Sequence, residues 1–280
     1  MTRPPVVAGQ FYEDSPELLR QQIRDSFLHD LGPGSLPSKS NESVKAAIAP
    51  HAGYVFSGPC AAWAYKAIAE AQTPEVFLML GPSHSGYNTC FSSENWSTPL
   101  GTVSTDKDFV EFLAAKTGIP IDNSSHAREH SIEVQLPFLQ FGLTKFKIAP
   151  LMVSHDIDVH QAASSVRKAI VESKKKVCII ASSDFTHYGV NYGYMPFSSN
   201  KKENMYRLDQ GAIDCILARK TGRFLDYVED KKQTICGYLA IAMLLDAVES
   251  ERAELLKYYT SGDVIHDYSS AVGYAAIVFR

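Results

Sequence analysis

The chain has 280 residues, of which 45% are hydrophobic and 21% charged, which is the composition of an average globular protein. Its formal charge of −4 argues against a protein whose main ligand is a nucleic acid, since such domains are usually clearly basic. The longest uninterrupted apolar stretch, Tyr238 to Leu245, is too short to span a membrane, and the first residues contain no signal-peptide core, so we expect a cytoplasmic protein.

Strand-like and helix-like segments alternate along the chain. A helix is predicted to begin after Ser15, with Pro16 at its first position, and to be followed by the polar loop 32–43. The later segments, in chain order, are strand Val44–Ala49, helix Pro59–Glu70, strand Val76–Leu80, an antiparallel edge piece within Phe91–Thr105, helix Asp106–Lys116, helix Glu133–Phe141, strand Ile148–Val153, helix His160–Glu172, strand Val177–Ala181, helix Asn204–Lys220, helix Tyr238–Ser250 and strand Ala275–Phe279. Short apolar strands that alternate with helices indicate an α/β fold. We therefore predict a single domain, residues 1–280, with a central, mostly parallel sheet flanked by helices.

Three histidines follow three of the predicted strands. His51, His84 and His187 lie two to six residues beyond the first, second and fourth strands, each in a loop that contains glycine. Ligands of open α/β sheets bind in the crevice beyond the carboxyl ends of the strands. The three imidazoles could therefore meet in one site, although each alone could equally be a surface or capping residue.

Acidic residues accompany these histidines. Asp184, three residues before His187, could fix the imidazole tautomer through a hydrogen bond, or could cap the following turn. Glu129 and His130 precede a predicted helix, and they either reach the same site or cap that helix. A zincin motif is excluded, because Ala127 stands where that motif requires glutamate.

The cysteines do not form a framework. There are five of them and no CxxC pair, so neither disulfides nor a zinc knuckle are expected. Cys178 lies in a predicted strand and Cys215 in a predicted helix, as small core residues do. Cys236 directly precedes a helix, whose dipole would favour its thiolate, and Gly237 beside it permits close approach of a ligand or backbone. Cys236 is therefore the candidate reactive cysteine.

Several motifs together resemble the Memo family in the order in which they occur. They are Pro50–Tyr54 (PHAGY), Gly81–His84 (GPSH), Glu129–Glu133 (EHSIE), Ser182–His187 (SSDFTH), Thr234–Gly237 (TICG) and the tail Ser269–Ala276 (SSAVGYAA). The resemblance covers nearly the whole chain. It is similar to prokaryotic or archaeal members that are often called AmmeMemoRadiSam system protein B.

This resemblance implies a metal site. Memo proteins resemble in fold the class III extradiol dioxygenases of the LigB type, which hold non-haem iron with two histidines and one glutamate. His51 and His84 match the histidine ligands, and Cys236 takes the place of the glutamate. His187 matches an acid–base histidine with Asp184 beside it, and we expect Glu129 and His130 in the same catalytic site. A His₂Cys set suits iron, copper or zinc.

Three functions stay open on this basis. The first is a redox or oxygenase-type enzyme with iron or copper, acting on a small molecule, in a pathway that the resemblance connects with AMMECR1-like and radical-SAM proteins. The second is a non-catalytic module whose cleft binds a peptide, because animal Memo is described as a signalling adaptor and a fold does not determine function. The third is a protein that sequesters copper or iron. Whether the protein is an enzyme is left open, because Cys236 replaces the carboxylate of a typical oxygenase.

Overall fold

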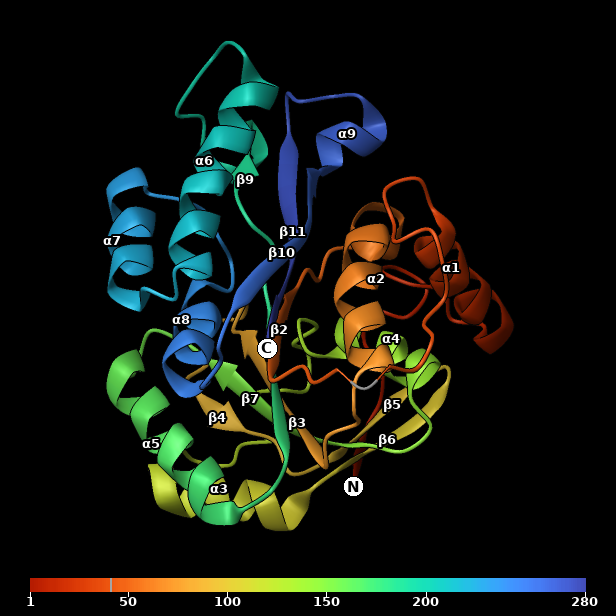
Figure 1. Cartoon of the computed structure of the whole chain (residues 1–280), viewed down its shortest axis with the longest axis vertical. Coiled ribbons are helices and arrows are strands. Elements are labelled where there is room, and N and C mark those ends of the chain that lie inside the picture. The colour runs from red at the N-terminus through yellow and green to blue at the C-terminus, as the bar shows by residue number, and fades with distance from the viewer. Residues whose placement is uncertain (41) are drawn as a thin grey trace.

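The computed structural model describes residues 1–40 and 42–280 and places a sheet between two groups of helices (Figure 1). Asn41, which belongs to the predicted loop 32–43, lies outside the described residues. The central strands are parallel and lie in the order β7 (Lys147–Val153), β3 (Val76–Pro82), β8 (Val177–Ser182) and β2 (Ala46–Ala49). These strands are almost completely buried, which explains their apolar sequences.

Antiparallel strands extend the sheet on both sides of this centre. On one side β11 (Ala271–Phe279) pairs with β2 and with β10 (Ala253–Thr260), and β9 (His187–Tyr188) pairs with β11. On the other side β5 (Asn95–Thr98) and β6 (Gly101–Thr105) form the predicted antiparallel piece, and β1 (Thr2–Arg3) lies beside β5. The short strand β4 (Cys90–Phe91) pairs with β7.

The helices cover both faces of the sheet. One face carries α1 (Pro16–Leu28), α2 (Tyr54–Glu70) and α4 (Leu136–Gly142), which follows the single turn η1 (Glu133–Gln135). The other carries α3 (Lys107–Thr117), α5 (Val159–Ser173), α6 (Lys201–Leu217), α7 (Thr221–Lys231) and α8 (Tyr238–Ala247) (Figure 1). The turn η2 (Val190–Tyr192) and the short helix α9 (Ser261–Ile265) lie in connecting segments. The predicted α/β fold with a mostly parallel sheet between helices is confirmed.

Alternating side chains divide the core into two layers. Ala46 and Ile48 of β2 pack into the layer beneath α5 and α8, whereas Ala47 and Ala49 pack beneath α2. This is the period of two that a strand imposes. Within residues 1–40 and 42–280, we find no helix that combines the length and the apolar character needed to cross a membrane.

Several predicted boundaries differ from the structure. Helix α1 begins as predicted, with the Ser15 side chain accepting a hydrogen bond from the Leu18 amide. Helix α2 begins at Tyr54 instead of Pro59. Proline is accommodated inside it because the carbonyl that loses its partner belongs to Val55, a residue 70% exposed to water. The predicted helix Asn204–Lys220 begins at Lys201 and ends at Leu217, and Tyr238–Ser250 ends at Ala247.

The strand order determines where the loops meet. β8 lies between β3 and β2, with Ala181 paired to Leu80 and Ser182 paired to Ala49. The carboxyl ends of these three strands are therefore neighbours. The loops that carry His51, His84 and His187 leave the sheet at this shared end.

Candidate metal centre

The carboxyl ends of β2, β3 and β8 open into a cleft of about 440 Å³. His51, His84 and His187 line this cleft together with His130 and Asp184, so the structure brings together all three strand-end histidines. Much of the remaining lining is aromatic or aliphatic, from the N-terminal arm, α2, η2, α9 and β11. Within the described part of the chain, no lysine or arginine lines the cleft.

His51 is buried, and its tautomer is determined by its neighbours. Its Nδ1 lies 2.8 Å from Ser182 Oγ. That hydroxyl donates its proton to the Ser131 carbonyl and accepts a hydrogen bond from Gln135 Nε2. Because the Ser182 proton is already engaged, Nδ1 of His51 must donate, and Nε2 presents its lone pair to Cys236 Sγ at 3.2 Å. Burial lowers the pKa of His51 well below its usual value, so the ring is neutral, as metal ligation requires.

His84 is held by Glu129. The Glu129 carboxylate accepts hydrogen bonds from the His84 amide at 2.7 Å and from Nδ1 at 2.9 Å, which leaves Nε2 as the free nitrogen of the neutral ring. Burial disfavours the protonated imidazole, but the hydrogen bond and charge of Glu129 outweigh it and raise the pKa of His84. Although burial opposes ionisation of Glu129, its contacts with His84 and Ser131 lower the pKa of this carboxyl. A carboxylate on the distal nitrogen is the usual support of a metal-binding histidine.

Cys236 lies in the loop before α8, and its environment differs from the prediction. Sγ lies 3.2 Å from His51 Nε2 and accepts a hydrogen bond from the Asp184 amide at 3.3 Å. Burial, followed by the negative charge of Asp184, raises the pKa of the Cys236 thiol well above its usual value. The expected stabilisation of the thiolate by the helix dipole is therefore outweighed. Without a metal ion the thiol keeps its proton, which Sγ can donate to His51 Nε2.

The residue beside this cysteine makes its position possible. The Gly237 amide donates to Ser183 Oγ at 3.0 Å, and a Cβ at Gly237 would lie 2.5 Å from the Ser182 carbonyl oxygen. The expected close approach at Gly237 is therefore to the end of β8. This close approach places Cys236 beside β8, whose Ser182 also supports His51.

The donor atoms of His51, His84 and Cys236 all lie within 4.8 Å of one another. Two further groups meet the same limit: His84, Glu129 and His130, and Asp184, His187 and Cys236. In the group of His51, His84 and Cys236, both imidazoles have their Nδ1 protons bound by the protein. Two free imidazole nitrogens and one displaceable thiol proton fit a metal ion.

His187 and Asp184 both line the cleft, but the hydrogen bond considered between them does not form. His187 Nδ1 donates to the carbonyls of Phe185 at 3.0 Å and Thr234 at 2.9 Å. Asp184 Oδ1 accepts instead from the amide of His51 at 2.8 Å, so this carboxylate fixes the start of the His51 loop. Backbone carbonyls, and not Asp184, determine the His187 tautomer and leave Nε2 free.

His130 reaches the cleft from the segment before η1. Its ring stacks on His84 with the centroids 4.6 Å apart, and the edge of Phe11 contacts it at 4.8 Å. Its Nδ1 lies 3.6 Å from Glu129 Oε1. Burial lowers the pKa of His130, so it is a neutral neighbour of the proposed ligands.

Several residues that support the site had no predicted role. Ser182, Gln135 and Thr234 set the orientations of His51 and His187 through the hydrogen bonds described above. Of these, Ser182 is the residue whose role the sequence could have indicated, because a serine at the end of a buried apolar strand must find a polar partner. Cys178 and Cys215 lie in β8 and α6, outside the cleft, as expected.

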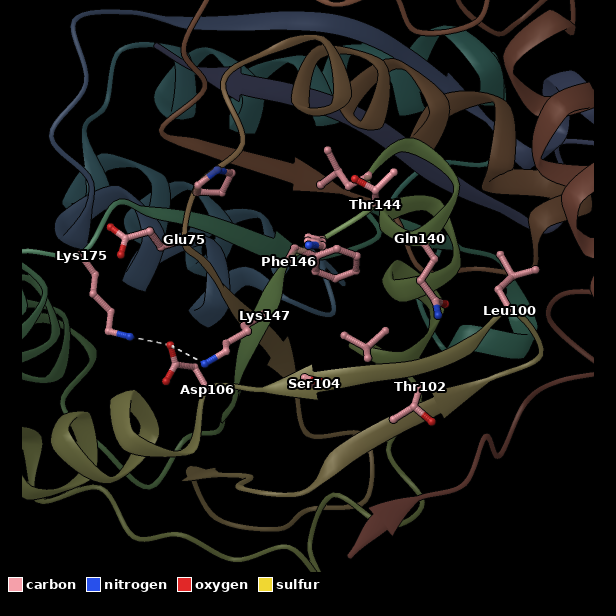
Figure 2. Close-up of a pocket in the computed structure, with 14 residues that line it drawn as sticks. Glu75, Leu100, Thr102, Ser104, Asp106, Gln140, Thr144, Phe146, Lys147 and Lys175 are labelled. Carbon is pink, nitrogen blue, oxygen red and sulfur yellow. Dashed lines mark hydrogen bonds and ion pairs between the residues drawn. The ribbon is translucent and has the colours of Figure 1, made fainter.

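A second cavity lies at the opposite end of the sheet. This groove, of about 770 Å³, runs beside the amino-terminal ends of β3, β7 and β8 (Figure 2). Three of its charged groups are paired with one another: Lys175 Nζ lies 2.6 Å and Lys147 Nζ 3.8 Å from Oδ2 of Asp106, which is the N-cap of α3. The groove is larger than the cleft, but it contains no histidine or cysteine and we assign it no chemistry.

Comparisons with known proteins agree with the motifs. A family model described as "Memo-like protein" matches residues 3–278. The MEMO1 family protein MK0963 of Methanopyrus kandleri is 43% identical, over 100% of this chain and 99% of that protein. A MEMO1 family protein of Nitrosopumilus maritimus is 39% identical, with both chains fully covered. Among solved structures, the uncharacterized protein JW3007 from Escherichia coli K12 matches with a TM-score of 0.53 and 12% identity over 85% of this chain and 100% of that one, a likeness of fold alone.

Proposed function

The chain belongs to the Memo family, and we propose that it is a metal-binding protein that holds iron or copper with His51, His84 and Cys236. The observation that carries this proposal is the arrangement of protons. Ser182 and Glu129 hold the Nδ1 protons of the two imidazoles, so that both Nε2 atoms are free beside one sulfur. A soft thiolate with two imidazoles favours iron or copper, while zinc would satisfy the same donors without redox chemistry.

The proposed activity is a redox or oxygenase-type reaction on a small molecule. Iron or copper would supply electron transfer and an open coordination position. The residues of the chain supply the surroundings: His187 presents a free Nε2 to the cleft and can accept or return a proton, and its carbonyl partners keep the ring in place. The mainly apolar walls would exclude water from a bound substrate. We place this reaction, on the family resemblance, in a pathway with AMMECR1-like and radical-SAM proteins.

A peptide-binding adaptor is less compatible with the cleft. The inner groups, three free imidazole nitrogens and the Asp184 carboxylate, are mainly hydrogen-bond acceptors when the rings are neutral. A phosphorylated peptide would bring negative charge to this surface without a lysine or arginine to receive it. A protein that only sequesters metal uses the same ligands, so a measurement of catalytic turnover is needed to distinguish sequestration from enzymatic activity.

Metal analysis of the purified protein tests the proposal. We expect about one iron or copper per chain in the wild type and a large loss in His51→Ala and Cys236→Ser. Cys215→Ser is the matched control, because Cys215 lies on α6 outside the cleft. Zinc alone would exclude the redox function, and equal metal content in Cys236→Ser and the wild type would exclude the ligand set.

A further inference from the structure

Arg3 on β1 is buried, with 2% of its surface exposed, and apart from a contact with the adjacent Pro4 carbonyl its guanidinium donates its hydrogen bonds to residues 126–133. Nε donates to the His126 carbonyl at 2.7 Å, and Nη2 donates to the Glu129 carbonyl at 2.6 Å. Nη1 donates to the Glu133 carboxylate at 2.7 Å. The guanidinium lies over the Trp96 ring, 4.1 Å from its centroid. The planar fork of arginine can hold several acceptors in fixed directions.

The segment that Arg3 holds has no regular structure before η1. Residues 126–128 and 131–132 form turns and Glu129 and His130 have no regular secondary structure, so contacts from outside the segment help to determine where Glu129 lies. The Glu129 side chain is then fixed locally, because its Oε1 accepts the amides of His130 and Ser131, both at 2.9 Å. Fixing the Glu129 main chain therefore also fixes its carboxylate.

His84 depends on that carboxylate. It lies in the exposed loop 84–88, and the hydrogen bonds it makes to other described residues, from its amide and from Nδ1, both end on Glu129. A connected path of hydrogen bonds thus leads from the guanidinium of Arg3 to the imidazole of His84. Within residues 1–40 and 42–280, Glu129 is the one hydrogen-bonding partner of that ring, which also stacks on His130.

We propose that Arg3 is a positioning residue for the metal ligand His84, acting through Glu129. This inference rests on the proposed function, because it concerns the geometry of that metal site. Glu133 neutralises the guanidinium and also accepts the amides of Val6 and Val7 and the Tyr12 hydroxyl. The N-terminal arm therefore closes over segment 126–133 without adding net charge near the metal ligands.

The test measures the affinity of the full-length protein for Co²⁺, and the absorption of the cobalt–thiolate bond reports the binding. Arg3→Lys keeps a cation beside Glu133 but loses the fork that holds two carbonyls. We expect its Co²⁺ dissociation constant to rise by about 10- to 100-fold, the range found when the outer partners of a metal ligand are removed. A wild type that gives no cobalt–thiolate absorption would refute the proposed metal site itself, and only a wild type that binds tests Arg3.

A double-mutant cycle separates positioning from a general loss of structure. If Arg3 acts through Glu129, Arg3→Lys should have little further effect in a Glu129→Gln protein, whereas independent roles would give additive losses. Additive losses, or an Arg3→Lys affinity within about twofold of the wild type, would overturn the inference.

Lys175→Met is the matched control. This substitution removes the closest cation of buried Asp106, which lies at the opposite end of the sheet from the metal ligands (Figure 2). Loss of Arg3 would remove the cation beside buried Glu133 in the same way. Lys175→Met should lower stability but keep the Co²⁺ affinity, and a comparable loss of affinity would contradict a specific role of Arg3. If Arg3→Lys does not fold, the pair Arg3→Met/Glu133→Gln removes both buried charges together and replaces it in the same cycle.

Discussion

At each of the three strand-end histidines, a protein acceptor binds the Nδ1 proton. The acceptors differ chemically: a serine hydroxyl for His51, a carboxylate for His84 and two carbonyls for His187. The result is the same in each case, because Nε2 is left free on the side of the cleft. Burial opposes protonation of His84, but the hydrogen bond and charge of Glu129 outweigh it and raise its pKa, whereas burial lowers the pKa of His51.

Removing the partner of His51 should weaken metal binding. Ser182→Ala frees the His51 Nδ1 proton and leaves Gln135 Nε2 with one acceptor fewer. We expect about a tenfold loss of metal affinity, measured by calorimetry with a competing chelator. Ser165→Ala on α5 is the control, since that hydroxyl donates its hydrogen bond to the preceding helical turn. Unchanged affinity in Ser182→Ala would show that the His51 tautomer is not determined by Ser182.

The raised pKa of Cys236 predicts two pH effects. In the metal-free protein the thiol should be alkylated slowly at pH 7, and Asp184→Asn should accelerate alkylation because it removes the negative charge that raises this pKa. Metal binding must release the thiol proton, so affinity should increase with pH. Mass spectrometry after timed iodoacetamide treatment measures the first effect, with Cys215 as an internal control. An Asp184→Asn rate equal to that of the wild type would contradict the electrostatic argument.

The sequence was most informative about which residues would gather and least informative about their partners. His51 and His84 follow buried strands that must lie in one sheet, so their convergence could be expected. Asp184 was expected to hold His187 or to cap the following turn, yet its carboxylate accepts the His51 amide. Glu129 was expected either in the catalytic site or at the start of the following helix, and the spacing did not indicate that its carboxylate would hold His84. Such pairings depend on loop conformations that residue spacing does not determine.

At the scale of elements, the order β3-β8-β2 makes the site possible. The buried strands could be recognised from the sequence because each is a short apolar run. Strand β10 could not, since its residues are mostly half-buried and mix charged with apolar side chains. Helix α7 was not predicted, and the predicted helix 204–220 extends past the end of α6, because the chain turns at Arg219, which has a positive φ of 56° without being glycine.

Asp209 connects α6 with the strands beside the site and should make stability depend on pH. It is fully buried and accepts hydrogen bonds from Thr186 of the His187 loop, from Tyr258 of β10 and from Gln233. Burial raises the pKa of Asp209 from 3.8 to about 6. The protonated form is therefore favoured in the folded state. This stabilisation is complete below the unfolded pKa and is lost as the pH rises through 6.

Asp209→Asn should remove this dependence. Relative to the variant, the wild type should lose about 2.4 kcal/mol of unfolding free energy between pH 4 and pH 7, at ~1.4 kcal/mol per pKa unit and with part of the loss below pH 4. Urea denaturation at several pH values measures the difference. Asp214→Asn, on the exposed face of the same helix, should show no comparable trend. A constant difference between the wild type and Asp209→Asn would mean that Asp209 is ionised in the folded protein at all these pH values.

Over the whole molecule, the proposed metal site joins parts that are distant in the sequence. His51 and His84 leave the sheet after β2 and β3, and Cys236 precedes α8, which packs on one face of the sheet. The groove beside Asp106 lies at the opposite end of the sheet, near the amino-terminal ends of β3, β7 and β8 (Figure 2). A bound ion would therefore link three segments that otherwise meet only through the hydrogen bonds and packing at the carboxyl end of the sheet.

Metal loading should consequently raise the unfolding temperature of the whole chain. A ligand at 100 times its dissociation constant adds about 2.7 kcal/mol if it binds only the folded state. For a chain of this length we expect an increase of about 5 °C, at ~2 °C per kcal/mol. Calorimetry of chelator-treated and reloaded protein measures the shift, which Cys236→Ser should abolish and Cys215→Ser should retain. If Cys236→Ser gains as much as the wild type, the stabilising ion is bound elsewhere, because loss of the thiolate must weaken any site that includes this sulfur.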